Sequence, residues 1–457
     1  MADQNNTDQK GISPKLYIET YGCQMNIADS EVVVSVLQDK GYTVTDDINK
    51  ADIILVNTCS IRENAEQRVW GRLDVFKQMK KKKPGLTVGV IGCMAERLKE
   101  KLIDEEKTVD LVVGPDAYRE LPGLLELAES GQKAVNVILS KEETYADISP
   151  VRLDKNRISA FISIMRGCNN MCSYCIVPYV RGAERSRNPE SILNEAKVLF
   201  DQGYKEITLI GQNVDSYHWE KGHHEKSKNF AQLLESVAKI SPNLRIRFST
   251  SHPKDMSDDV LYVMAMYNNI CNHIHLPAQS GSTNILEKMN RGYTREWYLD
   301  RIKAIKKILP DCAISTDLMT GFPGETEEDH QQTLSLMKEV NYDFAYMFKY
   351  SERPNTYAAR HLDDDVLESD KSRRLTEIID LQNELSEKSK KEDLGKVFEV
   401  LIEGVSKKSK DHFFGRNSQN KVVVFPRLNF KIGDYVYVEI IDCTSATLIG
   451  EVVVTRR

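Results

Sequence analysis

The chain has 457 residues, of which 41% are hydrophobic and 28% are charged, and its formal net charge is −6. This length predicts two or three domains, and so small a net charge says little about partners. The N-terminus lacks the basic start and apolar stretch of a signal peptide, and no apolar run approaches the roughly 20 residues that cross a bilayer. We therefore expect a cytoplasmic protein with no membrane partner, whose nine cysteines stay reduced and indicate metal binding rather than disulfides.

Residues 14–130 are predicted to form an N-terminal domain built on a parallel α/β sheet. Strands are expected at residues 15–20, 51–57 and 87–91. The residues that follow them include Cys23, Cys59 and Cys93. A helix is expected at 30–40, capped by Gly41, and residues 60–64 are expected to open another helix over the cysteines. Because ligands bind beyond the carboxyl ends of parallel strands, we predict that the three cysteines form one metal site; the alternative is that each is a small apolar residue filling a strand end.

Residues 154–385 are predicted to form a central domain in which strands and helices alternate, after a polar connection at 126–156. Six strands are expected at 158–165, 206–210, 244–249, 273–276, 313–318 and 344–350. Helices between them are expected at residues such as 189–202 and 230–240. Six such units fit a partial (β/α)6 barrel, and barrel enzymes carry their chemistry on the loops that follow the strands.

The loop after the first of these strands contains three cysteines in the pattern Cys-x-x-x-Cys-x-x-Cys, namely Cys168, Cys172 and Cys175. Three thiolates so closely spaced can bind one metal centre, and a four-iron cluster held by three cysteines leaves one iron open to a substrate or cosubstrate. A structural zinc site is the alternative, but no fourth cysteine or histidine lies nearby to complete its tetrahedral ligand set.

The other loops after the strands are rich in amides, hydroxyls and glycines, which suit a ligand with a ribose, an adenine and an amino-acid end. His252 and His275 are interpreted as structural or hydrogen-bonding residues rather than as metal ligands, since the cysteines already supply enough ligands. Cys271 and Cys312 begin strands and are interpreted as core residues.

Residues 388–455 are predicted to form a small antiparallel β-barrel, which follows a helix at 364–393. Its strands are expected at 397–402, 421–425, 435–440 and 449–454. Between Lys407 and Lys431 there are seven cationic residues and one acid, with phenylalanines interleaved. Cations for phosphates and aromatic rings for stacking favour RNA binding, and a solvated basic face over core phenylalanines is the alternative. The candidate RNA-binding residues are Lys407, Lys408, Lys410, Phe413, Arg416 and Lys421.

Together, these motifs resemble the methylthiotransferase family of radical S-adenosylmethionine (SAM) enzymes. The matching segments are residues 21–26, 57–59, 92–93, the central cysteine loop with its continuation to Gly182, and a C-terminal TRAM-like domain. The resemblance implies two [4Fe-4S] clusters and SAM as cofactors, with Cys168, Cys172 and Cys175 holding the cluster that cleaves SAM. It implies that Cys23, Cys59 and Cys93 hold an auxiliary cluster that carries or supplies sulfur. The candidate SAM-binding residues are Tyr174, Gln212, Asn213, Ser249 and Asp317.

Residues 59–63 and 275–282 resemble the subgroup of this family that acts on tRNA. That resemblance implies insertion of a methylthio group at carbon 2 of N6-dimethylallyladenosine 37. The implied partners are the tRNA anticodon stem-loop and an external electron donor such as a flavodoxin or ferredoxin. One departure is that Gly211-Gln212-Asn213 stands where other radical SAM enzymes often have Gly-Gly-Glu, so a carboxylate partner for the SAM amine is missing there.

Two other interpretations stay open from the sequence. One is a sister methylthiotransferase that acts on N6-threonylcarbamoyladenosine 37 or on an aspartate of a ribosomal protein. The other is an iron–sulfur RNA-binding protein without catalysis, although a sensor or electron carrier needs no second open iron.

Overall fold

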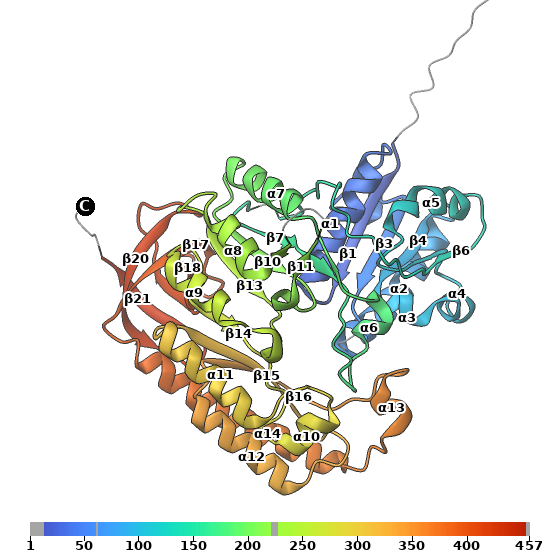
Figure 1. The fold of residues 1–457 in the computed structure, drawn as a ribbon. Helices are drawn as coiled ribbons and strands as arrows, with labels where there is room; N and C mark the ends of the chain where they lie inside the picture. Colours follow the sequence, from blue (N-terminus) through green and yellow to red (C-terminus); the bar gives the residue numbers. More distant parts are fainter. Residues whose placement is uncertain (1–12, 61–62, 155, 221–226, 454–457) are drawn as a thin grey trace, which may run out of the picture. The chain divides into compact units, whose positions relative to one another are not determined.

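The computed structural model describes residues 13–60, 63–154, 156–220 and 227–453 (Figure 1). The chain divides into two compact units: residues 1–153 with 179–182, and residues 154–178 with 183–457. No helix among the described residues is both long enough and apolar enough to cross a membrane.

The first unit contains a six-stranded sheet in which every pair is parallel, with the order β2-β1-β3-β4-β5-β6. Figure 1 labels β1, β3, β4 and β6 of this sheet. Its strands are β1 (Lys15–Tyr21), β2 (Thr43–Val44), β3 (Ile53–Thr58), β4 (Thr87–Gly92), β5 (Leu111–Val113) and β6 (Ala134–Asn136). Its helices include α1 (Gln24–Gln38), α2 (Glu63–Lys82), α3 (Cys93–Leu98), α4 (Glu100–Glu105) and α5 (Leu121–Glu129).

The sheet of the first unit is covered on both faces, which explains its nearly continuous apolar strands. Ile53 and Leu55 of β3 pack with α1 and α5, whereas Ile54 and Val56 of the same strand pack with α2, α3 and α4. The three strands expected from the sequence are confirmed. Strands β2, β5 and β6 were not predicted, because segments of two or three residues are too short to show a period.

Helix α1 begins six residues earlier than expected, directly after Cys23. Its N-terminus is fixed by a reciprocal pair of contacts between Cys23 and Asn26, so a cysteine takes the place usually held by serine, threonine or aspartate.

The central part of the second unit consists of two three-stranded parallel sheets, β7-β10-β13 and β14-β15-β16. Its strands are β7 (Ser159–Ser163), β10 (Glu206–Ile210), β13 (Arg245–Ser249), β14 (His273–His275), β15 (Ala313–Thr320) and β16 (Phe344–Lys349). Short additional strands are β8 (Met165–Arg166), β9 (Arg185–Ser186), β11 (His218–Trp219) and β12 (Lys228–Asn229). The helices are α7 (Pro189–Asp201), α8 (Phe230–Ala238), α9 (Asp258–Met266), α10 (Thr283–Lys288), α11 (Arg295–Ile308), α12 (Glu327–Val340), α13 (Tyr357–His361) and α14 (Glu368–Lys391). Helix α6 (Val177–Arg181) begins in this unit, but its residues 179–181 belong to the first unit. The alternation and the six main strands confirm the expected order.

One face of the central strands is apolar and the other is polar. Ile207, Ile246 and Leu318 belong to a single large core with the surrounding helices. The alternate residues, such as Thr208 and Arg247, face the opposite side of the same sheets because strand side chains alternate with a period of two.

The C-terminal part of the second unit is a closed five-stranded barrel with the order β17-β18-β19-β21-β20. Its strands are β17 (Val397–Val405), β18 (His412–Asn417), β19 (Val422–Pro426), β20 (Tyr435–Cys443) and β21 (Leu448–Val452). The expected barrel is therefore present, with one strand, β18, that the sequence analysis missed. One pairing, β19 with β21, is parallel. Strand directions cannot alternate all the way around a closed ring of five strands.

The barrel is joined to the central strands by buried charges. Arg245 and Arg247 of β13 both bond the Glu206 carboxylate and donate to backbone carbonyls of residues 416–418, in the β18–β19 hairpin. Because two guanidinium groups pair with the Glu206 carboxylate, its pKa is held below the usual value despite burial.

Candidate metal centres and nucleic-acid interface

The three cysteines of the first unit lie at one edge of its sheet. Tyr21 pairs with Thr58, and Thr58 pairs with Gly92, so β1, β3 and β4 end at the same level. Cys23, Cys59 and Cys93 follow these ends by one or two residues. This is the arrangement that the sequence predicted for a metal site.

Glycines and asparagines allow the three loops to approach closely. A Cβ atom added at Gly22 would lie 2.7 Å from Cys59 Cβ, and one added at Gly92 would lie 2.4 Å from Asn57 Oδ1. Gly92 also has φ +90°, a conformation that other residues rarely adopt. The buried Asn57 amide donates to the backbone oxygen of Asn26 at 2.8 Å, which connects the β1 and β3 loops.

The thiols of this site interact electrostatically. A hydrogen bond from Cys59 and the nearby charge of Arg181 together lower the pKa of Cys23 to about 6, against the effect of burial. Burial raises the pKa of Cys93, although the Nε atom of Arg181 lies 3.2 Å from Cys93 Sγ. Arg181 also pairs with the buried Asp29 carboxylate at 2.7 Å, and sequence analysis did not identify either residue. A thiolate-binding metal would compensate the buried negative charge that these three thiol groups carry when they are deprotonated.

The helix expected after Cys59 is present as α2, which begins at Glu63. Ile61 and Arg62, which belong to that prediction, lie outside the described residues.

The cysteine loop of the second unit is held by an internal hydrogen bond, and two of its cysteines are buried. The backbone N–H of Cys175 donates to the carbonyl of Cys172 at 3.0 Å, and Cys168 and Cys172 are buried. Burial raises the pKa of Cys168 to about 11 and that of Cys175 to about 12. Thiols that are costly to ionise in an apolar site suit a cation, which displaces their protons and balances their charge on binding.

Residues 288–290, at the end of α10, are hydrogen-bonded to this cysteine loop. Ser173 donates from its backbone nitrogen to Met289 O at 3.0 Å and from Oγ to Lys288 O at 2.7 Å, and Asn290 Nδ2 donates to Met171 O at 2.8 Å. The residue that follows, Arg291, places its Nη1 atom 3.3 Å from Cys172 Sγ.

Buried polar atoms without a hydrogen bond are spread over the described part of the chain, and several of them lie in the loops after β10 and β13. They include Gln212 Oε1, Asn213 Oδ1 and His252 Nε2. Such atoms are rare in folded proteins unless a ligand or water satisfies them, so these loops fit a polar cofactor such as SAM. Burial lowers the pKa of His252 to about 2, which keeps this ring neutral and supports its interpretation as a hydrogen-bonding residue.

The candidate SAM-binding residues all lie in the second unit. Ile210 pairs with Ser249, which puts Gln212, Asn213 and Ser249 at neighbouring strand ends. Tyr174 lies in the cysteine loop, with its hydroxyl 3.4 Å from Arg291 Nη1. Asp317 lies within β15, with Oδ1 3.4 Å from His275 Nε2. Cys271 is buried as expected, and Cys312 is partly buried against the same core.

Strand β16 carries a row of exposed aromatic side chains that the sequence analysis did not single out. Phe344, Tyr346 and Phe348 are 47%, 49% and 40% exposed and share one face of the strand. Tyr346 is opposite Asp317 and its ring contacts His275, so this face also carries the polar side chains of β14 and β15. Aromatic residues at every second position were the signal that could have revealed it.

The C-terminal barrel separates the candidate RNA-binding residues into two groups. Lys407, Lys408 and Lys410 are exposed between β17 and β18. Arg416 is paired with Glu403 at 2.8 Å but keeps a side chain that is 42% exposed.

Two members of the candidate set are not at the surface, and the expectation is corrected for them. Phe413 is 1% exposed and packs against Phe425 in the barrel core, so its ring is not accessible to a base. Lys421 is 9% exposed, and its Nζ atom pairs with Asp393 at 2.6 Å and Asp343 at 3.0 Å. Its charge therefore joins the barrel to the central strands.

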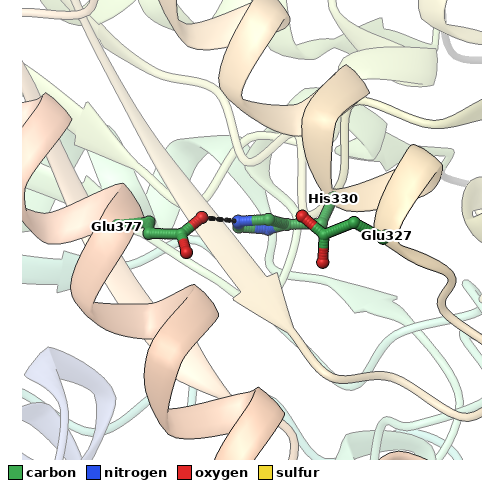
Figure 2. A group of neighbouring side chains, drawn as sticks. All are labelled: Glu327, His330 and Glu377. Carbon is green, nitrogen blue, oxygen red and sulfur yellow. Dashed lines mark hydrogen bonds and ion pairs between the residues drawn. The ribbon is translucent and has the colours of Figure 1, made fainter.

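Another group with metal-ligand chemistry, Glu327, His330 and Glu377, connects α12 with α14 (Figure 2). His330 Nε2 lies 2.8 Å from Glu377 Oε2. Arg373 donates to both carboxylates at 2.7 Å, so a guanidinium already supplies the positive charge there. We interpret this group as an ion-pair network.

Three family models match the chain. The model described as "Uncharacterized protein family UPF0004" matches residues 15–114, that of the radical SAM superfamily matches 162–337, and that of the TRAM domain matches 391–453.

Curated relatives cover nearly the whole chain. The tRNA-2-methylthio-N(6)-dimethylallyladenosine synthase of Parabacteroides distasonis is 61% identical over 96% of this chain and 95% of its own length. The proteins of the same name from Amoebophilus asiaticus and Porphyromonas gingivalis are 59% and 58% identical, over 96% and 99% of this chain and 93% and 98% of their own lengths.

Solved structures share the fold at low sequence identity. The radical S-adenosylmethionine methyltransferase TsrM from Kitasatospora setae has a TM-score of 0.57 at 15% identity, over 76% of this chain and 75% of that one. The cobalamin-dependent S-adenosylmethionine radical enzyme OxsB has a TM-score of 0.53 at 14% identity, over 81% of this chain and 56% of that one.

Proposed function

The chain belongs to the radical SAM family of tRNA-2-methylthio-N(6)-dimethylallyladenosine synthases, and from this premise we propose that it inserts a methylthio group at carbon 2 of N6-dimethylallyladenosine 37 of tRNA. The observation that carries the proposal is the presence of two separate three-cysteine sites in a chain that also has a TRAM domain. A sulfur-inserting radical enzyme needs both sites, whereas an electron carrier or sensor needs one.

We assign Cys168, Cys172 and Cys175 as ligands of the [4Fe-4S] cluster that the radical SAM family implies. When bound, such a cluster supplies the electron for reductive cleavage of SAM to a carbon radical. The carbon radical is needed because the hydrogen on carbon 2 of the adenine ring is not acidic, so a general base cannot remove it. The loops after β10 and β13 would hold SAM, with Gln212, Asn213 and Ser249 within reach of its polar groups.

We assign Cys23, Cys59 and Cys93 as ligands of a second cluster. Their positions at three adjoining strand ends support one shared centre, because thiols on three separate surfaces would not influence one another's ionisation. Three protein ligands would leave room for the sulfur that is inserted.

For the target nucleoside we propose the aromatic row of β16 as the docking face. Adenine stacks on aromatic rings, and the dimethylallyl group adds apolar surface that phenylalanine and tyrosine can cover. The base has to leave the anticodon loop to reach this face, as in other enzymes that act on a base.

Lys407, Lys408 and Lys410 are proposed to contact the phosphates of the tRNA anticodon arm. Their exposure and their position on a TRAM domain support this role, and Arg416 is a fourth candidate. A flavodoxin or ferredoxin is the proposed electron donor, and the cytoplasm, where tRNA is modified and thiols stay reduced, is the proposed compartment.

The proposal is tested with anaerobically reconstituted, reduced protein, SAM and tRNA that already carries dimethylallyladenosine. Mass spectrometry of the digested tRNA is expected to detect the 2-methylthio nucleoside. If 5′-deoxyadenosine forms but this nucleoside stays unmodified and threonylcarbamoyladenosine becomes methylthiolated instead, the substrate assignment is wrong.

The aromatic row is tested in the same assay. Phe348→Ala is expected to raise the KM for this tRNA, while Tyr262→Ala, an aromatic residue of α9 that is 56% exposed, serves as the control. An unchanged KM in Phe348→Ala would contradict the proposed docking face.

A further inference from the structure

Arg291 is a buried cation that has no carboxylate partner among the described residues. It is 5% exposed. Its hydrogen-bond acceptors are the Tyr293 hydroxyl at 3.1 Å, the Pro277 carbonyl at 2.9 Å, the Tyr174 hydroxyl at 3.4 Å and Cys172 Sγ at 3.3 Å. All of these groups are neutral while Cys172 is a thiol.

Five other buried arginines of this protein have a carboxylate partner, and two of them share one carboxylate. They form ion pairs at 2.5 to 2.9 Å with Asp29, Glu195, Glu206 or Glu325, and they are Arg181, Arg187, Arg245, Arg247 and Arg374. Burying a guanidinium without a counter-charge is costly, and arginine cannot escape the cost by losing its proton. The negative charge that balances Arg291 is therefore missing from the protein alone.

The backbone holds Arg291 against the cysteine loop. It lies between Asn290 and Gly292, whose φ angles of +54° and +72° turn the chain sharply after α10. The three hydrogen bonds from Ser173 and Asn290 described above join this turn to residues 171–173. The distance between the guanidinium and Cys172 is thus set by local structure before any cofactor binds, which is the condition for an electrostatic contact that costs no reorganisation.

We propose that Arg291 is the counter-charge of the iron–sulfur cluster at Cys168, Cys172 and Cys175, and that it favours the reduced cluster through its hydrogen bond to the Cys172 sulfur. Three thiolates outweigh the charge of an oxidised [4Fe-4S] core, so the bound centre is an anion, and reduction makes it more negative. Hydrogen bonds to ligand sulfurs and nearby cations are among the factors that set the reduction potentials of such clusters.

In this role Arg291 is a positioning residue that acts through Cys172. One electron enters from a low-potential external donor, and Arg291 stays protonated without forming or breaking a bond. The inference rests on the proposed assignment of the three cysteines as cluster ligands.

The test uses the full chain with Cys23, Cys59 and Cys93 replaced by alanine, so that only one cluster is measured. Without SAM, the ratio of reduced to oxidised cluster is followed by electron paramagnetic resonance against redox mediators. Arg291→Gln is expected to lower this ratio about tenfold at a fixed potential, which corresponds to about 59 mV for a one-electron couple. Arg291→Lys, which keeps the charge, is expected to recover most of the loss.

Arg295→Gln is the matched control. Arg295 also donates to backbone carbonyls, those of Gly281 and Gln332, and it pairs with Glu339, but it contacts no cysteine among the described residues. Its replacement is expected to leave the ratio unchanged. An unchanged ratio of reduced to oxidised cluster in Arg291→Gln would overturn the inference. If that ratio is unchanged and only the affinity for SAM falls, Arg291 binds SAM and does not act on the cluster.

A second measurement does not depend on the folding of Arg291→Gln. When the arginines are labelled with ¹⁵N, pulsed electron paramagnetic resonance is expected to detect a weak coupling between a ¹⁵N nucleus and the reduced cluster. Arg291→Lys is expected to remove this coupling. Absence of the coupling in the parent overturns the inference. A parent chain that binds no iron would instead overturn the ligand assignment in "Proposed function", and this inference with it, so the two failures are distinguishable.

Discussion

Gly92 illustrates how single residues hold the cysteine edge of the first unit. Its φ of +90° turns β4 into Cys93, and the missing side chain leaves room for the Asn57 amide, which in turn bonds the loop after β1. Backbone conformation and side-chain space are therefore both needed at this position. Gly41 separates the two requirements, since its φ is +89° but a Cβ atom there would contact nothing within 4 Å.

We predict that Gly92→Ala reduces the iron bound by a chain in which Cys168, Cys172 and Cys175 are replaced by alanine. Gly41→Ala is the control. Both substitutions place an alanine in a left-handed backbone conformation, which costs about 1 to 2 kcal/mol, but only Gly92→Ala brings a Cβ atom into contact with the Asn57 side chain. The measurement is iron per chain after reconstitution, together with the melting temperature. Equal iron loss in Gly41→Ala and Gly92→Ala would contradict this explanation.

Glu96 gives the first unit a pH-dependent stability. Its carboxyl is 1% exposed, and burial raises its pKa from 4.5 to about 7. Because the folded state favours the protonated form, the stability from this group is fully present below pH 4.5 and is lost as the pH rises through 7.

Glu96→Gln is therefore expected to stabilise the protein at pH 8 by roughly 2 to 3 kcal/mol, at about 1.4 kcal/mol per pKa unit, and by much less at pH 5. The measurement is the difference in melting temperature between variant and parent at the two pH values. A difference that is the same at pH 5 and pH 8 would show that burial does not perturb this carboxyl.

The residues that could be predicted from the sequence are those whose roles follow from local spacing or strand order. The Cys168 loop is a local pattern, and Cys23, Cys59 and Cys93 follow predictable strands. Arg181 and Arg291 could not be predicted, because each meets its cysteine from a segment 88 or 119 residues away. Phe413 was wrongly predicted to be available for RNA, because the alternation of aromatic and cationic residues does not indicate which ring faces the barrel core.

Among the elements, β13 has two functions. Its apolar residues pack under the helices, while Arg245 and Arg247 on the other face hold the β18–β19 hairpin through backbone carbonyls. The strand itself was predictable from its length and flanking turns. Its charged pair was not interpreted at the sequence level, because two arginines in a strand give no indication of which carbonyls or carboxylate they bind.

We predict that Arg247→Ala weakens the attachment of the C-terminal barrel. Breaking a buried pair leaves Glu206 with less compensation and typically costs about 3 to 5 kcal/mol. A protease that cuts after glutamate is expected to release the C-terminal fragment faster from this variant than from the parent.

Arg373→Ala is the control for that experiment. Arg373 also joins two carboxylates, but its side chain is 44% exposed, so the expected cost is about 1 kcal/mol or less. The two variants releasing the fragment at the same rate would contradict the anchoring role of Arg247.

At the scale of the whole molecule, the charge is distributed unevenly although the net charge is only −6. The exposed lysines at 407, 408 and 410 belong to the TRAM domain, whereas the basic residue Lys421 is consumed by internal ion pairs. The three lysines are therefore available for phosphates, whereas Lys421 is not.

Replacing Lys407, Lys408 and Lys410 by glutamine is expected to weaken tRNA binding and to make it less dependent on salt, by about 0.7 in the logarithmic slope for each phosphate that the variant no longer binds. Binding is measured by fluorescence anisotropy at salt concentrations from about 50 to about 200 mM, a roughly fourfold range. Lys303→Gln, at a side chain that is 71% exposed on α11, is the control. An unchanged slope in the triple variant would place the RNA-binding surface elsewhere.

The central claim is a division of labour between two three-cysteine sites, and one experiment tests it directly. Parent, Cys93→Ala and Cys172→Ala proteins are reduced with SAM and dimethylallyladenosine-containing tRNA, and 5′-deoxyadenosine and the 2-methylthio nucleoside are quantified together by mass spectrometry. We predict both products from the parent, 5′-deoxyadenosine alone from Cys93→Ala, and neither from Cys172→Ala. Full methylthio product from Cys93→Ala, or 5′-deoxyadenosine from Cys172→Ala, would contradict the account.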